Sequence, residues 1–276
     1  MAFIADNNGR PQIQSDLAFC ELLENHLPEL DRNFDELFSE MNDGVRAVAN
    51  VTDNALSNVG GDWYEWLIAL QAWNDFANNV ITHLAIPLPN VTGLDIASLY
   101  VPELHELITD LRTKVQQTNV ELITSNPDFV IIDGARAREI LNPLTAIDEI
   151  TPVSLTEVNN KYTNFLNSCT FDQILGFLSV KKSLRPDRRL QMSHEGSLIK
   201  ALYKHIQTRR WIINPNGIKY YGISTNLTQA DITGLRTVAT HSIISVETLP
   251  QRAVDDVFIV NSLQQARNVF QQILSA

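Results

Sequence analysis

The spacing of apolar residues changes near residue 120, and this change limits the folds that the chain can adopt. Before it, apolar side chains recur every three or four positions, which is the period of helices that bury one face. Such stretches are LAFCELLENHL, LDRNFDELFSEM, DWYEWLIALQAWNDFANNVITHL and, after a break at Pro87, Pro89 and Asn90, VPELHELITDLRTKVQQ. The first part of the chain is therefore predicted to be mostly helical.

Short segments rich in β-branched and aromatic residues follow, and they predict strands. They are VELITS, DFVII, FLSVK, IKYYGIS and SIISVETL, interspersed with the helix-like stretches SLTEVNNKYTNFLN, SHEGSLIKALYKHIQT and SLQQARNVFQQIL. Strands that alternate with helices indicate an α/β fold in which helices flank a mixed sheet. We place a loosely bounded helical N-terminal part at residues 1–60 and the main, sheet-containing part at residues 61–276.

Charge is distributed unevenly along the chain. The net charge is −11, which by itself argues against a nucleic-acid partner. Between residues 181 and 210, however, nine basic side chains stand against two acidic ones, so this stretch carries +7 and the rest −18. A basic face on an acidic body suits a protein that binds DNA phosphates, although a solvated charged helix would give the same count.

Several classes of protein lack support in the sequence. No apolar run approaches the roughly 18 residues of a membrane span, and the N-terminal stretch lacks a secretory signal, so we expect no membrane contact and a cytoplasmic location. Cys20 and Cys169 have no CxxC spacing, and the histidines form no cluster with ligand spacing, which argues against zinc. We find neither a glycine-rich phosphate loop nor a G-x-S-x-G elbow.

Two candidate catalytic residues lie at predicted strands. Asp128 follows Asn126 and Pro127 and precedes Phe-Val-Ile-Ile, so its carboxylate would lie at a strand end where a metal ion could bind. Lys181 ends the strand FLSVK, on the same face as Ser179. A lysine there could orient an attacking water and neutralise charge on a phosphate. Taken singly, the aspartate is also typical of an ordinary turn, and the lysine of an edge strand.

Two further groups of polar residues lie between positions 185 and 195. Ser193 is a predicted N-cap, which places Glu195 in the first turn of a helix, either as an acid favoured by the helix dipole or as a metal ligand. Upstream, Arg185, Asp187 and Arg188 fall within four residues. Arginine pairs with guanine O6 and N7, and aspartate accepts from the cytosine amino group, so this cluster could read adjacent G and C bases. A surface turn with a local salt bridge is the alternative.

Taken together, this layout resembles the CCGG-cutting family of type II restriction endonucleases. Asp128 and Lys181 have 52 residues between them, Lys181 and Glu195 have 13, and the Arg-x-Asp-Arg cluster begins four residues after the lysine. Stretches similar to the members that cut purine-CCGG-pyrimidine are GDWYEWL, LITSNPDF, FLSV, RPDRRLQ, HEGSLIKALY and TVATHSI. The likeness extends from about residue 60 to 260 and is weaker before it.

The resemblance implies a restriction-endonuclease-like core with a rearranged PD-(D/E)XK active site. The common form has an acid two residues before the lysine, where this chain has Ser179, and the family takes that acid from the following helix, at Glu195. By position, Asp128, Glu195 and Glu65 would bind Mg²⁺, and Lys181 would position the attacking water. An exposed carboxylate on an amphipathic helix is the alternative for Glu65.

The resemblance also implies the substrate and the assembly. Arg185, Asp187 and Arg188 match the family triplet that reads the CCGG core. The expected substrate is double-stranded DNA, cut before the first C of R/CCGGY to leave four-base 5′ overhangs, with a companion DNA methyltransferase protecting the same site. The family assembles as homodimers that pair into homotetramers. Trp211 is a candidate for that interface, and a place in the core is the alternative.

Two other functions fit parts of this sequence. A repair or junction-resolving nuclease of the same fold would read DNA shape, and so would not need the Arg-x-Asp-Arg cluster. A non-catalytic, sequence-specific DNA-binding protein would use the basic segment alone. The remaining basic residues near the candidate site are expected to face phosphate or solvent: Lys182, Arg189, Lys200 and Lys204.

Overall fold

One mixed sheet forms the centre of the computed structural model, which describes residues 3–7, 10–89, 93–122, 126–244 and 249–275. Within those residues five strands follow the order β3-β4-β5-β6-β7. They are β3 (Leu84–Pro87), β4 (Phe129–Ile132), β5 (Ile174–Val180), β6 (Lys219–Ser224) and β7 (Asp256–Ile259). The pairs β3–β4 and β4–β5 are antiparallel, whereas β5, β6 and β7 run parallel. The sheet and its flanking helices confirm the predicted α/β fold.

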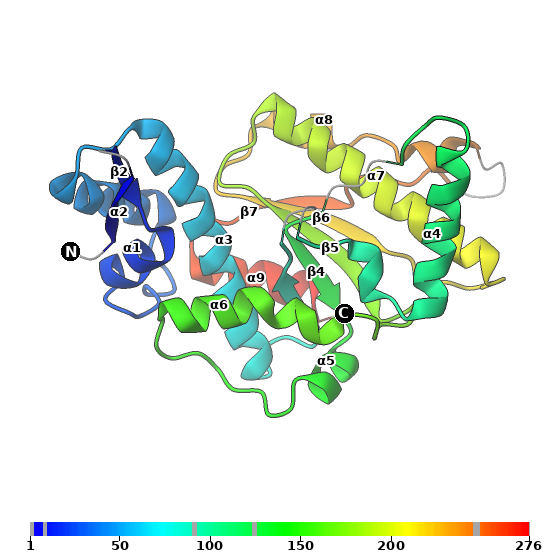
Figure 1. Ribbon diagram of the computed structural model, residues 1–276, viewed down its shortest axis with the longest axis horizontal. Coiled ribbons are helices and arrows are strands. Elements are labelled where there is room, and N and C mark those ends of the chain that lie inside the picture. Colours follow the sequence, from blue (N-terminus) through cyan, green and yellow to red (C-terminus); the bar gives the residue numbers. More distant parts are fainter. Residues whose placement is uncertain (1–2, 8–9, 90–92, 123–125, 245–248, 276) are drawn as a thin grey trace.

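The N-terminal part is a small unit of helices with a hairpin that the sequence did not predict. It comprises β1 (Ile4–Asn7), β2 (Arg10–Ile13), α1 (Ser15–Leu22) and α2 (Phe34–Val48), which lie at the blue end of the chain in Figure 1. It leads into α3 (Asp53–Ala77), whose N-cap Thr52 accepts a hydrogen bond from the backbone of Ala55. The division that we drew at residue 60 falls inside this long helix.

Helices cover both faces of the sheet. On one face α7 (Pro186–Arg209) contacts β6, and α4 (Pro102–Gln116) packs against α7 (Figure 1). Elsewhere α3 contacts β3, α6 (Pro152–Asn160) and α9 (Leu263–Ile273). The shorter elements are η1 (Ile96–Leu99), α5 (Gly134–Ile140), η2 (Lys161–Phe165), α8 (Gln229–Leu235) and η3 (Thr240–Ile244). None of the described helices combines the length and the apolar character needed to cross a membrane.

The core explains why the sheet strands read as continuous apolar runs. Every residue of β4 is buried, and β5 is buried along almost its whole length, because helices cover both faces. From α3, the large side chains of Trp63, Tyr64 and Phe76 are fully buried in the same core. The strand ends are therefore held rigidly, and polar residues at those ends have defined positions.

Three expectations about local structure were wrong in the described residues. The segment predicted as the strand VELITS has no strand at residues 120–122, where Val120 is 56% exposed and thus offers no face to a sheet; residues 123–125 lie outside the description. In SIISVETL, residues 242–244 belong to η3, and residues 245–248 lie outside the description. Ser193 is not an N-cap, because α7 already begins at Pro186, whose fixed φ suits a first helical position.

Candidate active site

Asp128 lies at the point where β4 begins, beside the carboxyl end of β5. The antiparallel register pairs Phe129 with Leu178, which brings the preceding aspartate next to the last residues of β5. Its Oδ2 accepts hydrogen bonds from the Ser179 hydroxyl at 3.0 Å and from the Val180 backbone N–H at 2.7 Å. The last residues of β5 therefore hold this carboxylate through Oδ2. Its other oxygen, Oδ1, faces the residue that follows Val180.

That oxygen meets Lys181. The Lys181 ammonium lies 2.6 Å from Asp128 Oδ1 and 3.8 Å from Glu65 Oε1. Burial raises the pKa of Glu65 to about 8, and repulsion from Asp128 acts in the same direction, partly offset by Lys181. Glu65 of α3 and Asp128, just before β4, thus lie beside the same ammonium. A further cation between them would lower the raised pKa of Glu65.

Glu195 lies deeper than the sequence predicted. It occupies the third turn of α7, only 2% exposed, so the helix dipole at the N-terminus does not explain its place. Its Oε2 accepts from the Tyr220 hydroxyl at 2.5 Å, and its Oε1 accepts from the Gln191 amide at 2.9 Å. Burial raises the pKa of Tyr220 well above its usual value, and the negative charges of both Glu195 and Asp128 raise it further. Asp128 bonds to Ser179, whose register partner Gly222 is two residues after Tyr220, so Glu195 and Asp128 lie on the same side of the sheet.

The carboxylates suit a hard divalent cation, although they are not gathered into a compact cluster. Among the described residues, no three Asp, Glu, His or Cys side chains lie close enough together to hold a metal ion between them. The donors that do converge are oxygens, with an ammonium beside them, and oxygen ligands favour Mg²⁺, Ca²⁺ or Mn²⁺ over zinc. Glu65 and Asp128 lie beside one ammonium, that of Lys181, and this shared position of two side-chain carboxyl groups is the observation that fits a further cation between them.

An open hollow of about 650 Å³ reaches Glu65 and Lys181, whereas Asp128 and Glu195 are not among its lining residues. Its wall is polar and is formed by α3, the end of β5 and the start of α7, with the lining residues Asn54, Ser57, Asn58, Gly61, Asp62, Glu65, Lys181, Lys182, Ser183, Arg185 and Arg188. Both candidate catalytic side chains of this list, Glu65 and Lys181, therefore face the same space as the two arginines. Such a charged hollow suits a phosphate backbone better than an apolar ligand.

The three predicted base-reading residues lie at the N-terminus of α7. Arg185 is the N-cap residue and Asp187 lies in the first turn, with their side chains 67% and 66% exposed and 3.7 Å apart. Arg188 is half-buried and lines the hollow. The exposed arrangement leaves all three side chains accessible to a ligand that enters the hollow. The next residue differs, because Arg189 pairs at 3.0 Å with Asp231 of α8.

Two of the basic residues expected at phosphate or solvent have other surroundings. Lys200 is 4% exposed and pairs at 2.7 Å with Asp255, so its predicted exposure was wrong. Lys182 is half-buried, and its ammonium lies 4.3 Å from the centre of the Phe38 ring in a space left by Gly60. These two cations help to hold the fold together, so fewer basic side chains face outward than the sequence count suggests.

Trp211 is 90% exposed immediately after α7, which removes a place in the core as its explanation. The nearby Ile213 is 87% exposed as well. Two large apolar side chains therefore stand in solvent at the C-terminal end of the helix that begins with the arginines. Exposed apolar groups of this size often mark a contact with another protein.

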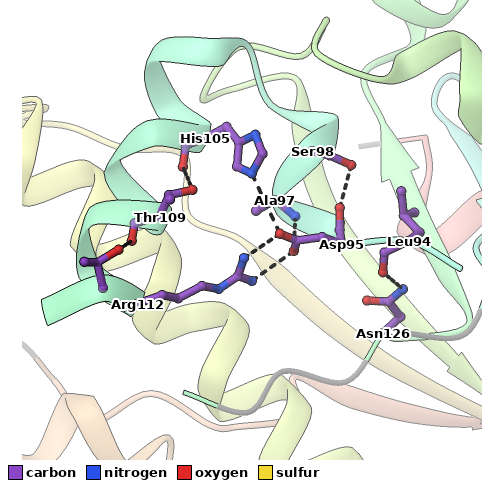
Figure 2. Close-up of polar contacts among 9 residues, drawn as sticks. Leu94, Asp95, Ala97, Ser98, His105, Thr109, Arg112 and Asn126 are labelled. Atoms are coloured by element: carbon purple, nitrogen blue, oxygen red, sulfur yellow. Dashed lines mark hydrogen bonds and ion pairs between the residues drawn. The ribbon is translucent and has the colours of Figure 1, made fainter. Parts of the chain in front are cut away.

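A polar cluster anchors the segment that leads to Asp128 (Figure 2). The side-chain amide of Asn126 donates to the backbone oxygen of Leu94 at 2.6 Å, as Figure 2 shows. It also donates to the backbone oxygen of Pro89 at 3.0 Å. The adjacent Asp95 caps η1 and receives a 2.9 Å hydrogen bond from Arg112 of α4. Through these contacts the turn before β4 is attached to α4.

Three residues near the site were not singled out from the sequence. Asp62 lies one turn before Glu65, a spacing that places both on one face of α3 and could have indicated it. Gln191 precedes Glu195 by four residues, which is also a same-face spacing. Tyr220 has no such signal, because only the pairing of β6 with β5 brings it there.

Comparison with known proteins supports this site at the level of the family. A family model described as "Cfr10I/Bse634I restriction endonuclease" matches residues 4–276. The curated protein "Type II restriction enzyme Cfr10I" of Citrobacter freundii is 42% identical over 264 residues, covering 94% of this chain and 93% of that protein.

Solved structures give the same result. The crystal structure of the type IIF restriction endonuclease Bse634I with cognate DNA matches with a TM-score of 0.87 and 31% identity, covering 99% of this chain and 97% of that one. A second Bse634I structure matches with a TM-score of 0.86 and 32% identity over the same shares of both chains.

These similarities place the chain among the restriction endonucleases, which are hydrolases that bind and cleave DNA. Within that class, it belongs to the Cfr10I/Bse634I restriction endonuclease family. The identification favours neither the repair nuclease nor the non-catalytic DNA-binding protein that the sequence left open.

Proposed function

We propose that this chain is a Mg²⁺-dependent type II restriction endonuclease that cuts double-stranded DNA at R/CCGGY and leaves four-base 5′ overhangs. The observation that carries the proposal is the convergence of Asp128 and Glu65 on Lys181, at the wall of a hollow that Arg188 also lines. Groups suited to hydrolyse a phosphodiester thus lie beside a group suited to read a base. The choice of R/CCGGY as the DNA recognition sequence rests on the resemblance to enzymes that cut there.

For the chemistry, we propose that Asp128, Glu195 and Glu65 would hold Mg²⁺ in a PD-(D/E)XK arrangement. A bound divalent ion would activate a water molecule and stabilise charge on the phosphate and on the leaving oxygen. Lys181 would orient that water and would offset negative charge on the scissile phosphate through its ammonium. Ser179, in place of the acid of the common motif, keeps Asp128 in position by donating to its Oδ2.

For recognition, we propose that Arg185, Asp187 and Arg188 read the CCGG core in the major groove. Their location at the first turn of α7 supports this role, because a helix N-terminus can enter the groove with its first side chains toward the bases. The exposure of Arg185 and Asp187 leaves their donors and acceptors accessible. The similarity to Bse634I, whose crystal structure was solved with cognate DNA, supports DNA as the partner.

For assembly, we propose a homodimer, with one active site for each strand of a palindrome, that pairs into a homotetramer through a surface containing Trp211. The 90% exposure of this side chain supports its place in an interface. We further propose that the protein acts in the cytoplasm within a restriction–modification system. A companion methyltransferase would then protect the same site in host DNA.

A plasmid digest followed by end mapping tests the proposed specificity. Supercoiled DNA of known sequence, incubated with the purified protein and Mg²⁺, should yield discrete fragments whose ends all map before the first C of R/CCGGY. Omission of the divalent ion should leave the plasmid intact. Cuts that follow junctions or damage, or ends at another sequence, would contradict the proposal.

A further inference from the structure

The shortest described hydrogen bond to Glu195 comes from a residue with no assigned role. Tyr220 is fully buried, and its hydroxyl donates to Glu195 Oε2 at 2.5 Å, whereas the Gln191 amide donates to Oε1 at 2.9 Å. A hydrogen bond to a charged acceptor is stronger and shorter than one between neutral groups. Tyr220 therefore contributes strongly to fixing the orientation of this carboxylate.

The backbone around Tyr220 is shaped to allow this contact. Tyr220 pairs with Phe177 in the parallel register of β6 and β5, which places it on the sheet face that α7 covers. The helix can approach that face because Gly196 follows Glu195. A Cβ at Gly196 would lie 3.1 Å from Tyr220 Cγ and 2.2 Å from the backbone oxygen of Ala253. The absence of a side chain at this helical position thus brings the carboxylate down to the phenol.

A buried ion pair holds the backbone of the same tyrosine. The Tyr220 N–H donates to Asp255 Oδ2 at 2.7 Å, and the Asp255 N–H donates to the Tyr220 carbonyl oxygen at 2.7 Å. Lys200, one turn beyond Glu195 on α7, lies 2.7 Å from Asp255 Oδ2 and also donates to the Arg252 carbonyl oxygen at 2.6 Å. The helix that carries Glu195 is therefore attached to this one residue of β6 through a side chain and through the backbone.

We propose that Tyr220 is a positioning residue, which fixes the Glu195 carboxylate in the orientation required to hold the divalent ion. The proposal rests on the proposed function, in which Glu195 is a ligand. A carboxylate has about four lone-pair positions, so hydrogen bonds from Tyr220 and Gln191 are compatible with cation binding. Partners that orient metal-binding carboxylates affect metal affinity by roughly 10- to 100-fold.

Direct measurement of Mn²⁺ affinity tests the role of Tyr220. The full protein, bound to a CCGG duplex with a non-hydrolysable scissile linkage, would be titrated with Mn²⁺ while the free ion is followed by electron paramagnetic resonance. Tyr220→Phe should weaken Mn²⁺ binding by roughly 10- to 100-fold. In cleavage assays it should raise the half-saturating Mn²⁺ concentration by a similar factor, and saturating Mn²⁺ should restore most of the turnover.

A matched control separates positioning from general loosening of α7. Tyr203 lies on α7 and is buried, as Tyr220 of β6 is, and its hydroxyl accepts a hydrogen bond from the Gly217 N–H. Tyr203→Phe should leave Mn²⁺ affinity unchanged. Because Gln191 is exposed, Gln191→Met should fold even if Tyr220→Phe does not, and it should weaken Mn²⁺ binding in the same direction. Unchanged affinity in Gln191→Met and Tyr220→Phe, or equal losses in Tyr203→Phe, would overturn the inference.

Glu195→Gln distinguishes failure of this inference from failure of the proposed function. If Glu195→Gln binds Mn²⁺ and cleaves like the wild type, the proposed metal ligand is wrong, whatever Tyr220→Phe does. If Glu195→Gln loses both properties while Tyr220→Phe retains wild-type affinity, the ligand stands and only the positioning role fails.

Discussion

The Lys181 ammonium lies 2.6 Å from a carboxylate oxygen of Asp128, so the two residues form a direct ion pair between the ends of β4 and β5. Replacement of either partner removes a group that the proposed reaction needs, whereas the residues proposed to read the bases stay in place. Asp128→Ala or Lys181→Ala should abolish plasmid cleavage and leave specific binding of a CCGG duplex largely intact in a gel-shift assay.

The neighbouring lysine offers a control for this prediction. Lys182 directs its ammonium at the Phe38 ring rather than at Asp128. Lys182 also lines the hollow, so Lys182→Met, which keeps the length of the side chain, should at most weaken DNA binding and should keep turnover at saturating DNA close to that of the wild type. Wild-type cleavage by Lys181→Ala would rule out the active site described above.

Arg188 and Arg189 are adjacent, yet only Arg188 lines the hollow, because Arg189 pairs with Asp231. Arg188→Ala should therefore reduce discrimination between CCGG and single-base variants by roughly 1–3 kcal/mol. Competition binding with a set of duplexes measures that discrimination. Arg189→Ala should leave it unchanged and should lower only the thermal stability; equal discrimination in the wild type and Arg188→Ala would refute the assignment.

Trp211 contributes little to the packing of its own chain, because its side chain is 90% exposed. Trp211→Ala should hence leave the melting temperature nearly unchanged and should convert the proposed homotetramer into dimers. Analytical ultracentrifugation checks the mass. Val153 of α6 is 67% exposed, and Val153→Ser serves as a control that should keep the tetramer. A Trp211→Ala protein that remains tetrameric would place the interface elsewhere.

Asp95 predicts a pH dependence of stability. Burial alone would raise the pKa of its carboxyl, but hydrogen bonds from Arg112 and the Ala97 N–H, with the charges of Arg112 and His105, outweigh burial and lower it below 3.8. A carboxyl whose pKa falls on folding stabilises the protein above its unfolded pKa, and this contribution is lost as the pH falls through the folded pKa.

Asp95→Asn should accordingly melt at a lower temperature than the wild type at pH 7, and the difference should shrink below about pH 4. Scanning calorimetry of both proteins over this range measures the gap. A gap that stays constant with pH would mean that the ion pairs in Figure 2 contribute nothing measurable.

The strands β4, β5 and β6 and most helices could be predicted because their signals are local, whereas β3 and β7 were missed. The apolar run after Asp128 and the largely apolar segment FLSV before Lys181 each lie within a single strand, and β4 and β5 are found at these places. The hairpin of β1 and β2 was missed, since its strands are only four residues long and mostly exposed. The strand β3 was missed because its apolar residues directly continue the helical pattern of α3.

The start of α7 was misplaced although the sequence contained the right cue. A proline at the first helical position, Pro186, marks a helix start, but the following residues are too polar to show a helical period. Apart from Gln191, four residues earlier on α7, the surroundings of Glu195 had no local cue. Tyr220 contacts Glu195, and Asp255 contacts Lys200, through strand register and helix packing between segments that are far apart in the sequence. The spacing of residues within one segment does not predict such contacts.

Helix α7 carries Arg188 in its first turn and Glu195 in its third. Seven residues of α-helix advance about 10 Å and complete nearly two turns, so both side chains leave the rod in almost the same direction. With the proposed roles, this length of α7 fixes the distance between the recognised base and the phosphodiester bond that is cut. An inserted residue between them would turn one end by about 100° relative to the other, so the cutting offset cannot drift by small steps in evolution.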